Sequence, residues 1–200
     1  VCTGVKEDRS LNGFIKKGHR ELVPLADFRT WIMSIRDTDQ YREKKRRDGT
    51  VYETKAGEMG YGPFTWEARQ LILEKLIETQ KKIGYELITV EELKAIDEIW
   101  DLELDFSRRT LVELYNRLTG VKLPWYYFKE PLFDEDTVTE LKKLAEENDV
   151  PFDLVRNIIL SVYHNKNYSN QRIMKEAISR LLNQQWLHYE VLKEIENENK

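Results

Sequence analysis

The chain has 200 residues, of which 40% are hydrophobic and 34% charged, and its formal net charge is -4. This composition provides enough apolar side chains for a core, which excludes wholesale disorder. No run approaches the roughly 20 consecutive apolar residues of a membrane span, and residues 1–20 lack the apolar centre of a signal peptide. The sequence therefore predicts a soluble protein of the cytoplasm with no membrane partner.

The chain has a single cysteine, Cys2, which excludes an internal disulfide and any metal site built from several thiolates of this chain. It begins with Val1 rather than methionine, and its only thiol comes second, so we expect a piece of a longer protein. Motifs of serine hydrolases, Walker-type phosphate loops, zinc proteases and paired cysteines are absent from the sequence. A self-contained catalytic site is therefore not predicted.

Apolar residues recur at helical spacing along most of the chain. The first such pattern predicts a helix from Glu21 to about Arg36. Thr65 is placed to cap a second helix that ends at Gly84. Thr89 and Glu92 have the spacing of a capping box, which predicts a third helix that fades near residue 105.

The second half of the chain continues this pattern. Residues 108–118 predict a short helix that is stopped by Gly120. The aromatic, proline-flanked residues 122–131 predict an irregular connector that packs on the helices. Further helices are predicted after Asp134, after Pro151, and over residues 169–196.

Alternation of the kind found in strands is almost absent, with weak candidates only at residues 50–54 and just after Gly84. The predicted fold class is therefore all-α, an irregular multi-helix bundle with a long basic glycine-rich loop. We expect two regions, residues 1–130 and residues 131–200, which can pack as one unit.

The long basic glycine-rich loop is predicted over residues 42–64. Basic side chains outnumber acidic ones in residues 1–55, and the reverse holds in residues 56–200. The loop opens on a basic cluster and contains several glycines, a combination suited to holding phosphate groups. The alternative is a solvated helix end whose cations favour the negative end of the helix dipole. The cations of the cluster are Arg42, Lys44, Lys45, Arg46 and Arg47.

Four stretches of the sequence are informative when they are taken together. They include Val-Cys-Thr-Gly at the start of residues 1–11 and Leu-Ala-Asp-Phe-Arg with Ile-Arg-Asp within residues 25–37. The most specific are Tyr-Arg-Glu-Lys-Lys-Arg-Arg-Asp-Gly at 41–49 and Gly-Pro-Phe-Thr at 62–65. Together they resemble the DndC family of DNA phosphorothioation sulfurtransferases, which belong to the ATP pyrophosphatases related to adenylyl-sulfate reductases. The resemblance covers residues 1–105 well, and beyond them it consists of helical character and an Asp-Val-Pro segment at 149–151.

The resemblance implies that the chain is the C-terminal part of a larger α/β enzyme that incorporates sulfur into the DNA backbone. It implies an upstream nucleotide-binding domain that uses ATP and magnesium, and an iron–sulfur cluster of which Cys2 is the last cysteine ligand. It also implies partners: DNA, a cysteine desulfurase and other phosphorothioation proteins. No cofactor and no activity are expected of this fragment alone. The basic cluster is expected to bind nucleotide or DNA phosphate.

Three other functions stay open at this stage. Residues 131–200 could form a module that docks partner proteins of a DNA-modification complex without touching substrate. The chain could belong to a reductase of adenylyl sulfates, because related folds host different reactions. An unrelated helical nucleic-acid-binding protein is disfavoured by the net negative charge.

Overall fold

The computed structural model describes residues 7–44, 46, 60–103, 105–165 and 172–183. These residues form helices and connections and contain no strand, apart from one isolated bridge between Arg42 and Phe64. The prediction of an all-α fold is confirmed for this part of the chain. The α-helices are α1 (Arg9–Lys16), α2 (Val23–Ile35), α3 (Trp66–Ile83), α4 (Val90–Glu103), α5 (Thr110–Thr119), α6 (Glu135–Glu147) and α7 (Phe152–Asn165).

Three short 3-10 helices and one further helical segment complete the fold. The 3-10 helices are η1 (Arg20–Leu22), η2 (Asp39–Tyr41) and η3 (Tyr126–Phe128). Residues 172–183 are also helical. None of the helices in the described ranges is long and apolar enough to cross a membrane.

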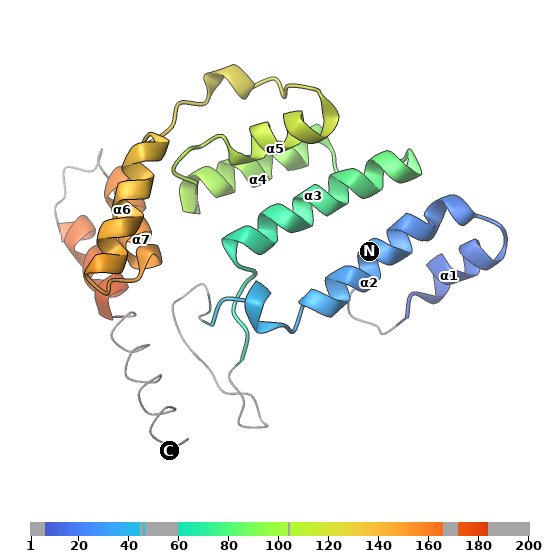
Figure 1. The fold of residues 1–200 in the computed structure, drawn as a ribbon, viewed down its shortest axis with the longest axis horizontal. Helices are drawn as coiled ribbons and strands as arrows, with labels where there is room; N and C mark the ends of the chain where they lie inside the picture. Colours follow the sequence, from blue (N-terminus) through green and yellow to red (C-terminus); the bar gives the residue numbers. More distant parts are fainter. Residues whose placement is uncertain (1–6, 45, 47–59, 104, 166–171, 184–200) are drawn as a thin grey trace, which may run out of the picture.

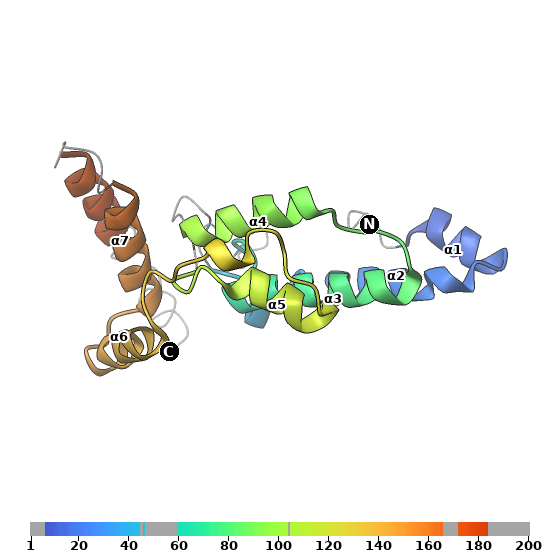
Figure 2. The ribbon, with the colours of Figure 1, turned by 90° about the horizontal axis from the view of Figure 1, so that it is seen from above.

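Helix α3 runs through the middle of the molecule (Figure 1). It packs against α2 on one side and α5 on the other, while α4 packs against α5 and α7. Seen from above, the molecule is elongated, with α1 at one end and the pair α6 and α7 at the other (Figure 2). In the chain, the loop 42–64 connects η2 to α3.

The main core lies where α3, α4 and α5 meet. Trp100 of α4 is buried and its ring meets that of Trp66 edge to face, with centroids 4.8 Å apart. Such aromatic pairs add to the free energy gained from burial alone. The buried members of this cluster are Leu73, Ile77, Ile88, Leu93, Trp100, Leu111, Val112, Leu114 and Leu123.

The predicted helix caps are present. The hydroxyl of Thr65 accepts a hydrogen bond from the backbone N–H of Ala68 at 3.2 Å. Thr89 and Glu92 exchange the two reciprocal bonds of a capping box, at 2.9 and 3.2 Å. Gly84 ends α3 with a φ of 72°, a left-handed conformation that glycine adopts without steric cost.

Three local features differ from the sequence expectation. Helix α1 was not predicted; Asp8 caps it by accepting from the N–H of Leu11 at 3.0 Å. The helix expected from Glu21 begins as η1 and becomes α-helical at Val23, because Pro24 has a fixed φ suited to a helix start. The strand considered after Gly84 is wrong.

The failed strand has a physical cause. The side-chain oxygen of Gln80 accepts hydrogen bonds from the backbone N–H groups of Leu87 and Ile88, at 2.7 and 3.1 Å. These two donors are therefore satisfied by a helix side chain instead of a neighbouring strand. The other strand candidate, residues 50–54, and the segments 166–171 and 184–196 of the long predicted helix lie outside the described residues.

The helices α6 and α7 meet the rest of the chain at an aromatic junction. The ring of Phe106 packs edge to face against those of Phe133 and Phe152, with centroids 5.6 and 6.2 Å apart. The backbone N–H of Leu132 also donates to the carbonyl of Phe106 at 2.7 Å. Phe106, from the predicted region 1–130, thus contacts residues of the predicted region 131–200.

Candidate functional site

The two ends of the loop 42–64 pair with each other. The backbone N–H of Glu43 donates to the carbonyl of Pro63 at 2.8 Å, and that of Gly62 donates to the carbonyl of Glu43 at 2.6 Å. A third bond runs from the N–H of Thr65 to the carbonyl of Tyr41 at 3.0 Å. We call residues 41–43 and 62–65 the stem, which joins the end of η2 to the start of α3.

Arg42 holds the stem closed. Its guanidinium group donates a hydrogen bond to the carbonyl of Gly62 and lies 4.6 Å from the ring centroid of Phe64. The ring centroid of Tyr61 lies 6.0 Å from the same guanidinium group. A cation above an aromatic face is stabilised by the charge distribution of the ring. Arg42, to which the sequence assigned phosphate binding, therefore makes its described contacts within the stem and with the adjacent Tyr61.

The remaining members of the basic cluster are only partly described. Lys44 and Arg46 lie just beyond the stem, and both side chains are exposed. Lys45 and Arg47 lie outside the described residues, as does Cys2. The structure therefore places two cations of the predicted phosphate site, Lys44 and Arg46, at the solvent-facing entrance to the loop.

The iron–sulfur cluster implied by the resemblance does not fit the ligands that this chain provides. Such clusters are usually held by four cysteine thiolates, and the chain has one cysteine. In the described ranges, no group of three or more histidine, cysteine, aspartate or glutamate residues is arranged to hold a metal ion. A cluster would need ligands from residues outside this sequence.

Glu43 places an acidic group at the base of the basic loop. Burial raises the pKa of its carboxyl group, and the nearby carboxylates of Asp153 and Glu67 act in the same direction. Arg156 and Arg69 oppose this rise in pKa. Since Asp153 and Arg156 belong to α7, the stem lies within electrostatic reach of that helix.

The start of α3 is poorly suited to bind an anion. Thr65 already satisfies the N–H of Ala68, and the first turn carries the acidic side chain of Glu67. A helix N-terminus attracts anions through free N–H groups and its dipole, and both contributions are reduced here. Any anion at this loop would depend on Lys44, Arg46 and their neighbours.

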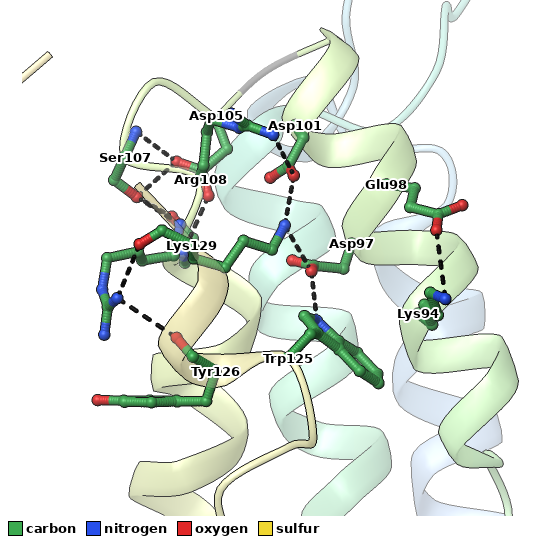
Figure 3. Close-up of polar contacts among 12 residues, drawn as sticks. Lys94, Asp97, Glu98, Asp101, Asp105, Ser107, Arg108, Trp125, Tyr126 and Lys129 are labelled. Carbon is green, nitrogen blue, oxygen red and sulfur yellow. Dashed lines mark hydrogen bonds and ion pairs between the residues drawn. The ribbon is translucent and has the colours of Figure 1, made fainter. Parts of the chain in front are cut away.

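A second group of charged residues lies where the connector 122–131 crosses α4 (Figure 3). The ammonium group of Lys129 lies 2.6 Å from a carboxylate oxygen of Asp97 and also pairs with Asp101. All three side chains are largely buried. Arg108 reaches the same oxygen of Asp101 at 3.5 Å.

Trp125 completes this group, which we call the lysine–aspartate cluster: Asp97, Asp101, Trp125 and Lys129. The indole N–H of Trp125 donates to Asp97 at 2.6 Å (Figure 3). The other oxygen of each aspartate is buried and has no hydrogen-bond partner among the described residues. The cluster therefore fixes two residues of the connector, Trp125 and Lys129, to one face of α4.

A third aspartate of the same face organises the turn after α4. Asp105 accepts hydrogen bonds from the backbone and side chain of Ser107, at 2.9 and 2.7 Å. Its other oxygen accepts from the N–H of Thr110 at the start of α5, at 2.9 Å. These contacts occupy both oxygens of Asp105, which therefore caps the start of α5.

The lysine–aspartate cluster is not among the sites predicted from the sequence. A signal was available, because Asp97 and Asp101 are four residues apart and Asp97 follows the buried Leu93 at the same spacing. Two acidic residues on the apolar side of a helix require a cationic or hydrogen-bonding partner. The partner itself, Lys129, could not be found from local spacing because it lies in an irregular connector.

Comparisons with known proteins return no matching family model, no curated relative and no solved structure.

Replacing Lys129 by methionine should destabilise the protein strongly. The substitution leaves the buried carboxylate of Asp97 without its cation and Asp101 with only the longer contact to Arg108, and breaking a buried ion pair costs about 3–5 kcal/mol. Urea unfolding followed by circular dichroism would measure this loss. The matched control is Lys94→Met, whose exposed pair with Glu98 spans 4.0 Å and should contribute less than about 1 kcal/mol. Equal effects of the two substitutions would contradict a stabilising role for Lys129.

Two aspartate variants should respond to pH with opposite signs. Burial raises the pKa of Asp101 despite its contact with Lys129, so its carboxyl favours folding below the ordinary value of about 4 and loses that contribution as pH rises. Hydrogen bonds from Thr137 lower the pKa of Asp134, so its contribution is present above about 4 and is lost as pH falls.

Relative to the wild type, Asp101→Asn should therefore gain unfolding free energy as pH rises from about 4, while Asp134→Asn should lose it. Urea unfolding at a series of pH values would measure both differences. A relative loss for Asp101→Asn with rising pH would mean that Lys129 lowers the pKa of Asp101 more than burial raises it.

Proposed function

We propose that this chain is the C-terminal region of a sulfurtransferase that helps to incorporate sulfur into the DNA backbone, and that the loop 42–64 contacts DNA phosphate. The resemblance of residues 1–105 to the DndC family supports the reaction class. The observation that supports the phosphate contact is the closed stem, which fixes the position at which the exposed Lys44 and Arg46 enter the loop.

The residues of this chain have separate roles in the proposal. Lys44 and Arg46 supply positive charge to the DNA backbone, and an arginine can hold two phosphate oxygens at once. Arg42 is a positioning residue, because its hydrogen bond to Gly62 and its contact with Phe64 hold the stem. ATP hydrolysis and the transfer of sulfur are assigned to residues of a longer protein.

Neutralising Lys44 and Arg46 together by substitution with glutamine should weaken binding to duplex DNA and reduce its dependence on salt. Each lost phosphate contact lowers the slope of log affinity against log salt by about 0.9, so the double variant should lose up to about 2. Fluorescence anisotropy across a salt series would measure both quantities.

The matched control for this experiment removes the same number of charges elsewhere. Lys94 and Lys143 are exposed and each pairs with a glutamate one helical turn away. Their joint replacement by glutamine changes the net charge equally but leaves the loop intact. An unchanged affinity and salt slope in the loop variant would exclude Lys44 and Arg46 from DNA contact.

The role of Cys2 is tested in the longer protein that the proposal requires. The reading frame upstream of Val1 should encode further cysteines and, before them, a glycine-rich phosphate loop. In that protein Cys2→Ser should reduce the bound iron and the characteristic visible absorption, because the cluster loses a thiolate ligand. A full-length product that begins near Val1, or one that retains its iron after the substitution, would contradict this assignment.

A protein-docking role for residues 131–200 is the second proposal, and one observation favours it. The helices of this region expose apolar side chains: about half of Leu144 and Leu182, and 41% of Ile173, is accessible. Exposed apolar side chains mark a partner-binding surface where they join into one patch. Two measurements distinguish this proposal from the first. The docking role predicts that residues 131–200 bind a partner protein and that the whole chain has no affinity for DNA.

A further inference from the structure

The helical turn η3 presents two aromatic rings to solvent. We call Tyr126, Tyr127 and Phe128 the aromatic turn; 72% of Tyr127 and 81% of Phe128 is exposed. The sequence predicts that residues 122–131 pack on the helices. Leu123 is buried as this prediction requires, whereas Tyr127 and Phe128 are not. The outward rings leave flat apolar surface in water, which is uncommon for phenylalanine.

The aromatic turn is held firmly on both sides. Trp125 donates to Asp97, and Lys129 pairs with the same carboxylate, so the residues before and after the turn are fixed to α4 (Figure 3). The guanidinium group of Arg109 also donates to the backbone carbonyls of Tyr126 and Lys129, at 3.4 and 3.1 Å. The exposed rings therefore project from a fixed backbone.

Two cations lie beside these rings. The ammonium group of Lys122 donates to the hydroxyl of Tyr127 at 2.7 Å and lies 4.6 Å from the centroid of its ring. The guanidinium group of Arg109 lies 4.8 Å from the ring centroid of Tyr126, and it also pairs with Glu113. Exposed aromatic surface and positive charge thus share one patch.

We propose that the aromatic turn is a stacking platform for an unpaired DNA base, with Lys122 placed to contact the adjacent phosphate. Aromatic rings next to cations are the combination by which proteins bind single-stranded nucleic acid, because each base has a flat face and each nucleotide a negative charge. This inference rests on the proposed function in taking DNA as the partner, and it adds a base contact to the phosphate contacts of the loop 42–64.

Charge favours nucleic acid over an apolar protein surface as the occupant. Covering Tyr127 and Phe128 with an apolar partner would also remove water from the ammonium group of Lys122, whose only described protein acceptor is the hydroxyl of Tyr127. Removing water from an unpaired cation is costly. A phosphate group next to the stacked base would compensate for that loss with a charge-assisted hydrogen bond.

The stacking platform and the basic loop can be altered independently. In Figure 1 the connector that carries η3 passes above α4 and α5, whereas the stem lies at the lower end of α3. Substitutions at Tyr127 and Phe128 remove exposed rings and leave the stem contacts of Arg42 unchanged.

The test compares three DNA probes on the whole chain: single-stranded oligodeoxythymidylate, an abasic oligonucleotide of the same length and charge, and a duplex. The wild type should bind the thymidylate about tenfold or more tightly than the abasic probe, and Tyr127→Ala with Phe128→Ala should abolish this preference. Binding to the duplex and its salt slope should not change. Phe128→Trp should retain the preference, because it keeps a flat ring.

The matched control is Tyr85→Ala, which removes a tyrosine that is 59% exposed elsewhere on the surface and should change nothing. Equal wild-type affinity for the thymidylate and abasic probes would overturn the stacking platform while leaving duplex binding, and with it the proposed function, intact. A preference that survives the double alanine substitution would overturn it as well. Absence of binding to all three probes would overturn both proposals.

Discussion

The pairing of Lys129 with Asp97 and Asp101 is the interaction on which the second half of the structure depends. It fixes an irregular connector to α4, and the same aspartate also holds Trp125. Burying charges costs several kcal/mol of hydration for each ion, and only close pairing and further hydrogen bonds compensate for it. Such pairing gives a connector whose regular structure is a single 3-10 turn one position on α4.

This arrangement has a direct effect on the surface. Trp125 and Lys129 contact the aspartates of α4, and two of the three residues between them, Tyr127 and Phe128, expose their side chains. Tyr127 and Phe128 are exposed in a fixed place, so they lose little further conformational freedom when a ligand covers them. The same contacts with α4 that bury Lys129 therefore also leave the rings of Tyr127 and Phe128 exposed.

Local signals in the sequence predicted much of the helical framework. Thr65, Gly84 and the pair Thr89 and Glu92 mark helix ends correctly, because caps depend on residues within one turn of each other. The boundary at Val23 and the coil after Gly84 were not predicted, although Pro24 and Gln80, which decide them, lie nearby in the sequence. The Gln80 side chain accepts from backbone N–H groups seven and eight residues further on, a spacing that no helix-cap motif includes.

The sites were less accessible to sequence reasoning than the helices. The basic cluster is recognisable as a run of basic residues in the sequence. The stem contacts of Arg42, however, depend on Gly62 and Phe64, which lie twenty or more residues away. The lysine–aspartate cluster joins residues 28 positions apart along the chain. The expected cluster ligand Cys2 and the cations Lys45 and Arg47 lie outside the described residues and stay predictions.

The closed stem has a consequence for how this protein can vary. Since backbone hydrogen bonds and Arg42 join the two ends of the loop, α2 and α3 keep their connection whatever length of chain lies between residues 44 and 61. For a chain segment whose two ends are joined, each doubling of its length costs only about 0.6 kcal/mol of closure entropy. The segment is accordingly a tolerant place for insertions, either in natural variants or for an engineered tag.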